Sequence, residues 1–245
     1  SGIGFGWDDA SYDKWWPADL HVIGKGITRF HAIYWPAFLL SAGLALPKAL
    51  FVHGYFTVNG QKMSKTIGNI IDPNSLIDTY GTDAIRYYFL REIPPFSDGD
   101  FSENRFIELY NADLANGLGN LAARVARLAS QTENVKVPPL PIYQTLYEQH
   151  PHYSLSCRNL RSDEALTYIW SQIKESDKLI DDTEPWKLEG EKKKDIIEKL
   201  IPRIQSIATL LEPFLPETAR VLKNHFSGNC ILPMTPLFPR IKSAK

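Results

Sequence analysis

The pattern of hydrophobic and polar positions changes about one hundred residues into the chain. Before that point, residues 20–23 predict a short strand that ends at Gly24, residues 27–44 predict an amphipathic helix, and residues 50–58 predict a second β-rich run. Asn59-Gly60 is a dipeptide that favours a hairpin turn. A strand, a helix and a strand with short connections predict part of a parallel α/β sheet.

From Asp72-Pro73 onward the pattern is helical. Residues 73–80 and 84–91 predict short helices separated by Gly81, with Thr82 or Asp83 as the N-cap of the second. Residues 93–100 predict a linker, and residues 138–151 predict an irregular loop. Ser102 opens a long helix whose apolar stripe is formed by Leu114, Leu118, Leu121, Val125 and Leu128. With later helices at 163–182, at 192–211 and from Pro213 or Pro216 to about residue 226, these segments predict a helical bundle.

The overall charge argues against nonspecific nucleic-acid binding driven by an excess of basic residues. The 245 residues contain 27 Lys and Arg against 28 Asp and Glu, a net charge of −1, so any contact with RNA has to be local. Cys157 and Cys230 lie far apart without a C-x-x-C pair, which argues against structural zinc. The sequence contains no run of 18 apolar residues, so it predicts no membrane span. We expect a cytoplasmic protein, with the mitochondrial matrix as the alternative.

The loop Lys62-Met63-Ser64-Lys65 is the sharpest candidate for chemistry. Two lysines three positions apart after a hairpin can direct two ammonium groups at a polyphosphate, while Ser64 adds a neutral donor. From these residues alone, a solvated lysine-rich turn is the more common explanation.

A polar stripe on the long helix is the second candidate. At 100° per residue one face carries Asp113, Asn116, Asn120, Arg124 and Arg127. Asparagine amides can bind the Watson–Crick edge of an unstacked base, and arginine can stack on it or bind phosphate. Trp186 follows Pro185 just past a predicted helix end, where edge-of-core packing and RNA recognition are equally compatible with the sequence. The stripe alone favours a solvated helix face.

An ordered set of motifs resembles the methionyl-tRNA synthetases, a family of class I aminoacyl-tRNA synthetases. The motifs follow the order and spacing of the family and extend over nearly the whole chain: residues 21–25, 30–37, 52–55, 62–69, 83–88, 120–124, 184–186 and 213–217. Lys62-Met63-Ser64-Lys65 by itself is shared by several class I synthetases. The ordered set indicates the methionine family.

This resemblance implies a fold and roles for particular residues. Residues 1–100 are expected to form the C-terminal part of a Rossmann-like nucleotide-binding fold with a stem-contact region, and residues 101–245 an anticodon-binding helix bundle. The implied catalytic residues are Lys62 and Lys65. The implied ATP-binding residues are Gly24, Lys25, Lys62, Ser64 and Lys65, the methionine-binding residues are Ile27 and His31, and the anticodon-binding residues are Asn120, Arg124 and Trp186.

The resemblance also implies a reaction. It is the ATP-dependent attachment of methionine to tRNA-Met, which carries the anticodon CAU, through methionyl-adenylate. ATP enters as a substrate with Mg²⁺, and no zinc site is expected in this chain.

Parts of the family pattern are absent from the sequence. The H-I-G-H signature and a W-x-D-A segment are missing, and Gly26 stands at a position that is usually acidic. We therefore expect a fragment that is inactive by itself. Two alternatives stay open, a non-catalytic tRNA-binding module and a synthetase for another hydrophobic amino acid.

Overall fold

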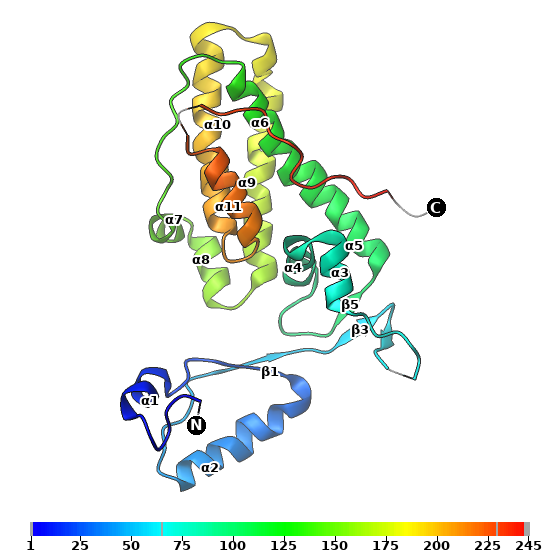
Figure 1. Ribbon diagram of the computed structural model, residues 1–245, viewed down its shortest axis with the longest axis vertical. Coiled ribbons are helices and arrows are strands. Elements are labelled where there is room, and N and C mark those ends of the chain that lie inside the picture. The colour runs from blue at the N-terminus through cyan, green and yellow to red at the C-terminus, as the bar shows by residue number, and fades with distance from the viewer. Residues whose placement is uncertain (1, 65, 229, 243–245) are drawn as a thin grey trace.

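A strand–helix–strand unit forms the first part of the molecule (Figure 1). The computed structural model describes residues 2–64, 66–228 and 230–242. Strands β1 (His21–Gly24) and β2 (Leu50–His53) pair in parallel, with His21 opposite Leu50 and Gly24 opposite His53. A short helix α1 (Asp9–Trp15), which the pattern did not predict, precedes them. The predicted parallel strand pair is confirmed.

The connection between β1 and β2 is a helix of changing pitch. It begins as the 3-10 turn η1 (Lys25–Ile27), continues as the π-helical η2 (Phe30–Tyr34) and ends as α2 (Trp35–Ser41). The wide π turn comes directly before Pro36, which has no N–H for an ordinary helical hydrogen bond. The helix also ends earlier than the predicted Leu44, because Gly43 adopts a left-handed φ of 69°.

The second predicted β run divides into two strands that belong to different sheets. β3 (Phe56–Val58) pairs antiparallel with β4 (Gln61–Lys62) and parallel with β5 (Gly99–Phe101). The hairpin turn is confirmed, since Asn59 and Gly60 both have positive φ, 49° and 74°. The division falls at Gly54, where a Cβ would lie 2.1 Å from the Ser97 carbonyl oxygen, so only glycine permits this close approach.

The segment predicted as a linker is partly ordered into the second sheet. Residues 99–101 form β5, whose Gly99 amide donates to the Tyr55 carbonyl oxygen at 2.9 Å. The linker prediction is therefore wrong for Gly99 and Asp100, because a three-residue strand carries too short a pattern to recognise. β5 also crosses the proposed boundary between residues 100 and 101.

Helices α3 (Pro73–Tyr80) and α4 (Thr82–Glu92) follow the hairpin. Gly81, with a φ of 85°, is the N-cap of α4, so the predicted capping by Thr82 or Asp83 is wrong. The Asp83 carboxylate instead accepts a hydrogen bond from the Thr218 amide, 135 residues away in the sequence. The Asp83 side chain, which the local sequence predicts as a cap of its own helix, thus caps a distant helix instead.

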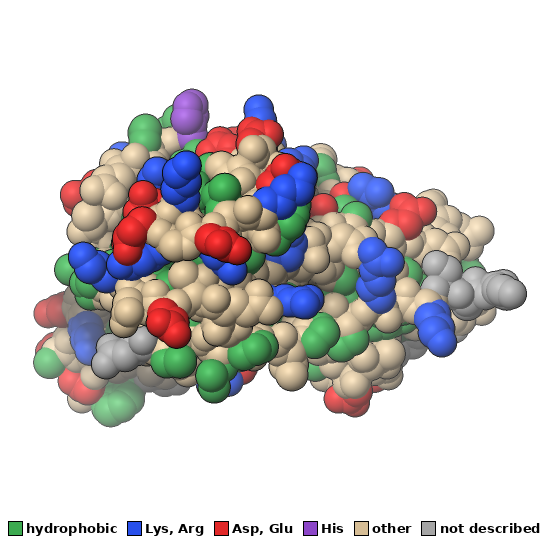
Figure 2. Space-filling model, turned by 90° about the horizontal axis from the view of Figure 1, so that it is seen from above, with side chains coloured by type: hydrophobic (Ala, Val, Ile, Leu, Met, Phe, Trp, Pro, Cys, Tyr) green, Lys and Arg blue, Asp and Glu red, His purple; other side chains and the backbone are tan. Residues whose placement is uncertain are grey.

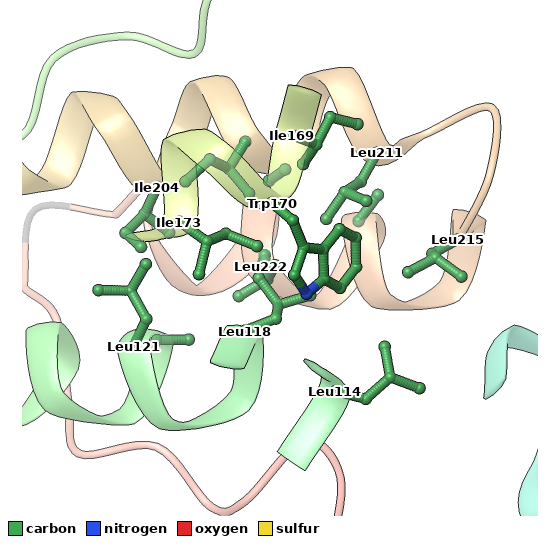
Figure 3. Packing of buried hydrophobic residues seen from close by; sticks show 14 of the residues in the cluster. Leu114, Leu118, Leu121, Ile169, Trp170, Ile173, Ile204, Leu211, Leu215 and Leu222 are labelled. Atoms are coloured by element: carbon green, nitrogen blue, oxygen red, sulfur yellow. The ribbon is translucent and has the colours of Figure 1, made fainter. Parts of the chain in front are cut away.

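The helical bundle encloses the main core of the described residues (Figure 3). Its first member is a continuous helix made of α5 (Glu103–Leu109), the π-helical η3 (Tyr110–Gly119) and α6 (Asn120–Ser130). The predicted apolar stripe is buried, and Leu114, Leu118, Leu121 and Val125 are each 0% exposed. The remaining long members are α9 (Ser162–Thr183), α10 (Gly190–Leu211) and α11 (Pro216–His225).

Two further short helices occupy the region expected to be irregular. They are α7 (Tyr143–Gln149) and α8 (Pro151–Arg158), which contribute the buried residues Leu146 and Tyr153 to the core. The loop prediction is wrong for residues 143–149, which form α7, and for its last residue, Pro151, which starts α8 at a position that tolerates its missing N–H. Within the described residues, no helix is long and apolar enough to cross a membrane.

Candidate nucleotide and anticodon sites

Gly24 and Lys25 lie together at the carboxyl end of β1. The Lys25 ammonium donates to both Asp98 carboxylate oxygens at 2.6 Å and lies 4.6 Å from the centre of the Tyr55 ring. The hydrogen bond from Lys25, assisted by the Tyr55 amide, lowers the pKa of Asp98 below its usual value. Lys25 is therefore an oriented cation with a partner, and both side chains are about half exposed.

The glycine at the usually acidic position has a steric counterpart in the structure. A Cβ on Gly26 would lie 2.5 Å from the Tyr55 hydroxyl oxygen. The phenol thus occupies the space that a side chain at residue 26 would need. With this placement of Tyr55, an acidic residue at position 26 requires the ring to move.

Ile27 and His31 follow on consecutive helical turns, as the spacing predicts. His31 Nδ1 lies 3.1 Å from the Ile27 carbonyl oxygen, and because a carbonyl only accepts, Nδ1 carries the proton. A hollow of about 410 Å³ beside His31 is lined by His21, Phe30, Tyr34, Trp35 and Phe38. Ile27 does not line this hollow and is 45% exposed. Our residue assignments missed the aromatic lining, although Phe30, Tyr34 and Phe38 recur every four residues on one helix face.

The lysine loop begins where β4 ends, at Lys62. The Asn69 side chain holds it from inside, since Asn69 Oδ1 accepts from the Ser64 amide at 2.8 Å and Nδ2 donates to the Lys62 carbonyl oxygen at 3.1 Å. The Lys62 side chain is exposed and forms no ion pair with a described carboxylate. Its charge is available to a ligand. Lys65, the second predicted catalytic residue, lies outside the described residues.

At the other end of the molecule, Asn120 and Arg124 lie on α6. Asn120 is exposed, and Arg124 donates to Asp177 at 3.0 Å and to Asp181 at 2.6 Å, both on α9. Burial raises the pKa of Asp177 above its usual value, although Arg124 opposes the shift. Arg124 is thereby fixed in direction while 28% of its side chain stays exposed.

The predicted polar stripe divides at residue 120. Asp113 accepts a hydrogen bond from the Tyr87 hydroxyl at 2.6 Å, and Asn116 accepts from Arg240 at 2.8 Å, so both have structural partners. Both lie on π-helical η3, which winds with more residues per turn than the 3.6 assumed for the stripe. The α-helical part, which begins at Asn120, keeps the predicted spacing.

Trp186 lies on the one-turn helix η4 (Pro185–Lys187), as the sequence predicts for a residue just past a helix end. Glu184 ends α9 in a left-handed conformation with a φ of 43°, and Lys187 pairs with its carboxylate. The Trp186 side chain is 53% exposed, whereas Trp170 inside the bundle is 5% exposed. Seen from above the bundle, acidic and basic side chains alternate on the surface, in keeping with the near-zero net charge (Figure 2).

Among residues 2–64, 66–228 and 230–242 no group of three His, Cys, Asp or Glu side chains is placed to hold a metal ion. Cys157 is half-buried and Cys230 is exposed, and both are free thiols.

Taken together, a parallel strand pair with a glycine and lysine at its carboxyl end, a lysine-bearing hairpin and a helical bundle define the architecture of a class I aminoacyl-tRNA synthetase. Comparison with known proteins agrees: the model of the class I tRNA synthetases (M) matches residues 5–126. The methionine–tRNA ligase of Thermotoga maritima is 42% identical over 231 residues, covering 89% of this chain and 37% of that relative. The corresponding ligase of Clostridium acetobutylicum is 41% identical over 239 residues, covering 92% and 37%.

A solved structure gives the same result. Mycobacterium tuberculosis methionyl-tRNA synthetase in complex with methionyl-adenylate superposes with a TM-score of 0.81 at 34% identity, over 98% of this chain and 53% of that chain. The chain belongs to the methionyl-tRNA synthetase family of class I tRNA synthetases. It spans 37% of the length of both curated relatives described above.

Proposed function

We propose that this chain supplies the lysine loop of the ATP site and the anticodon-binding bundle of a methionine–tRNA ligase. The observation that carries the proposal is the Trp186 indole, 53% exposed at a helix end, five residues beyond the Asp181 carboxylate that holds Arg124. An exposed aromatic plane just past the end of α9 and a guanidinium that α9 holds in place suit an unstacked base and its phosphate. Asn120, one helical turn before Arg124, supplies an amide for the base edge, and the ligand is the CAU anticodon of tRNA-Met.

In the first step of the proposed reaction, the methionine carboxylate attacks the α-phosphorus of ATP and pyrophosphate leaves. Lys62 and Lys65 neutralise the charge on the phosphates, and Ser64 adds a neutral donor. Gly24 and Lys25 contact the nucleotide, and Ile27 and His31 contact methionine. Two observations support this assignment. The Lys62 ammonium forms no ion pair with a described carboxylate, and the Asn69 side chain holds the Lys62 backbone by donating to its carbonyl oxygen. Mg²⁺ enters with ATP, and no described residue is assigned to it.

In the second step, a terminal hydroxyl of tRNA-Met attacks the adenylate carbonyl and AMP leaves. The bundle binds the anticodon during this step and so selects the tRNA. The relatives described above come from bacteria, which supports the cytoplasm as the proposed compartment, with the mitochondrial matrix as the alternative.

A non-catalytic anticodon-binding module is a second candidate function for the chain alone. It is favoured by the exposed Trp186 indole and the oriented Arg124 guanidinium, because neither of them needs ATP to bind RNA. Both candidates predict RNA binding by the bundle. Only the first predicts that Lys62 is required for adenylate formation in a polypeptide that contains the whole catalytic domain.

The test measures binding of the 245-residue chain to a fluorescent RNA stem-loop carrying CAU, against the same stem-loop with an exchanged anticodon. We expect selective binding of CAU, and equal affinity for both loops would refute the anticodon assignment. In a polypeptide that joins this chain to an H-I-G-H half, we expect Lys62→Ala to abolish methionine-dependent ATP–pyrophosphate exchange. Unchanged exchange would refute the role of the lysine loop.

A further inference from the structure

Two charged residues of α4 reach the turn between the last two helices of the bundle. The Asp83 carboxylate accepts from the Thr218 amide at 2.7 Å. Arg86, three residues further along α4, donates from Nε to the Phe214 carbonyl oxygen at 2.7 Å and from Nη2 to the Pro213 carbonyl oxygen at 2.9 Å. The pair thus contacts the turn on both sides of its centre.

Each of the two charges suits the helix end that it contacts. α10 ends at Leu211, where the helix dipole favours a cation, and Arg86 binds the carbonyls that follow. α11 begins at Pro216, where the dipole favours an anion, and Asp83 binds the amide of the third residue. An N-cap side chain ordinarily binds this amide, but the N-cap of α11 is Leu215, which makes no side-chain cap hydrogen bond.

Asp83 is an expensive means of capping a helix. It is 7% exposed, and its Oδ1 has no hydrogen-bond partner among the described residues. A local cap at residue 215 is not available, because Leu215 is 0% exposed and belongs to the core. The long-range pair does something a local cap cannot, because it fixes α10 and α11 against α4.

Helix α4 is in turn joined to the hairpin that carries Lys62. Phe89 of α4 packs against Phe56 of β3 with ring centres 5.5 Å apart, and against Phe101 of β5 at 6.0 Å. β3 is the strand that pairs with β4, where Lys62 lies. A continuous set of contacts therefore extends from Lys62 through α4 to the base of α10.

Because α10 is long, a small change of angle at its C-terminal end, which is its base next to α4, moves its N-terminal end by a large distance. Helix α10 is a long member of the bundle (Figure 1), and its 22 residues span about 33 Å. It begins three residues after η4, which carries Trp186. A tilt of about 10° at the base of a helix of that length displaces its far end by about 6 Å. Such a displacement is larger than a hydrogen bond or a base-stacking contact tolerates.

We propose that Asp83 and Arg86 are positioning residues, which set the angle between the anticodon-binding bundle and the lysine hairpin so that one tRNA reaches both. This inference rests on the proposed function for its ligand. It assigns to neither residue a contact with RNA or ATP.

The first test measures the angle itself, without RNA. Nitroxide labels are placed at Gln61→Cys beside Lys62 and at Lys192→Cys near the start of α10, in a background with Cys157→Ser and Cys230→Ser. Pulsed electron resonance gives the distance distribution between them. We expect a narrow distribution in the parent chain and at least a doubling of its width in Asp83→Asn and Arg86→Gln.

Matched controls make the same chemical changes elsewhere. Asp78→Asn on α3 and Arg203→Gln on α10 replace exposed residues that have no described side-chain partner, and we expect the parent width. Arg86→Lys keeps the cation but loses the paired donors, and it should give an intermediate width. It also serves if Arg86→Gln does not fold. A parent-like width in both Asp83→Asn and Arg86→Gln would overturn the proposal.

The second test separates positioning from ordinary stabilisation. We expect Asp83→Asn and Arg86→Gln to bind a CAU stem-loop within twofold of the parent, because the stem-loop touches only the bundle. Whole tRNA, which bridges both parts, should bind about tenfold more weakly, since simultaneous contacts lose effective concentration. Equal losses for both RNAs would overturn the proposal. If the parent chain binds neither RNA, the proposed function fails, whereas the distance measurement still decides the positioning role.

Discussion

Replacing Trp186 by alanine tests the proposed anticodon site most directly. The indole is 53% exposed in the free chain, so a large part of its surface is available to a base. Stacking of a base on an aromatic side chain contributes about 1–3 kcal/mol by alanine substitution. At about 1.4 kcal/mol per factor of ten, Trp186→Ala should weaken binding of a CAU stem-loop by about 5- to 150-fold.

The same substitution has a bounded effect on stability. The buried half of the Trp186 side chain corresponds to roughly 100 Å², which at about 25 cal/mol per Å² gives at most about 2.5 kcal/mol. A domain of this size is ordinarily stable by about 5–15 kcal/mol, so the bundle should stay folded. Circular dichroism before each titration checks this.

The assay is fluorescence anisotropy with a labelled CAU stem-loop at fixed salt. Trp15→Ala is the matched control, because Trp15 is 59% exposed but lies on α1, in the other part of the molecule. We expect the control to bind like the parent chain. Binding by Trp186→Ala within twofold of the parent, or an equal loss in Trp15→Ala, would refute the assignment.

Three further outcomes follow from the structure. Leu118→Ala leaves a cavity at a position that is 0% exposed, and it should lower the free energy of unfolding in urea by about 2–5 kcal/mol. The control Leu155→Ala, at a position that is 57% exposed, should change this free energy by less than about 0.5 kcal/mol. Similar effects of the two substitutions would contradict the assignment of Leu118 to the core. Asp177→Asn should raise the melting temperature at pH 7, because burial raises the pKa of Asp177 in the fold and the charged form is disfavoured there. Below the pKa of the unfolded chain, 3.8, the Asp177 carboxyl group is protonated in both the folded and the unfolded state. The difference in melting temperature between Asp177→Asn and the parent should therefore vanish as the pH falls below about 3.8. A melting temperature of Asp177→Asn below that of the parent at pH 7 would contradict this prediction. The 245-residue chain by itself should give no methionine-dependent ATP–pyrophosphate exchange above background, and exchange at a rate typical of a synthetase would show that it needs no further part.

Periodicity succeeded where a long element repeats its pattern. The stripe from Leu114 to Leu128 predicted a buried helix face, and the limits of α9 and α10 fall within a residue or two of those expected. The Asn59-Gly60 turn was predictable because few dipeptides adopt positive φ twice. Short elements failed, since β5, α7 and α8 contain too few residues to show a period.

The sequence by itself determined the family resemblance, the alternation of strand and helix, and the residue types available for phosphate and base recognition. Those features are local, because spacing along the chain specifies them. Only the tertiary structure decided the partners: Asp98 for Lys25, Asp177 and Asp181 for Arg124, Tyr87 for Asp113, and Thr218 for Asp83. Each partner lies between 26 and 135 residues away along the chain, and packing alone brings such groups within hydrogen-bond distance. The fold thus leaves Lys62 without an ion-pair partner among the described residues, orients Arg124 and makes Asp83 the cap of a distant helix.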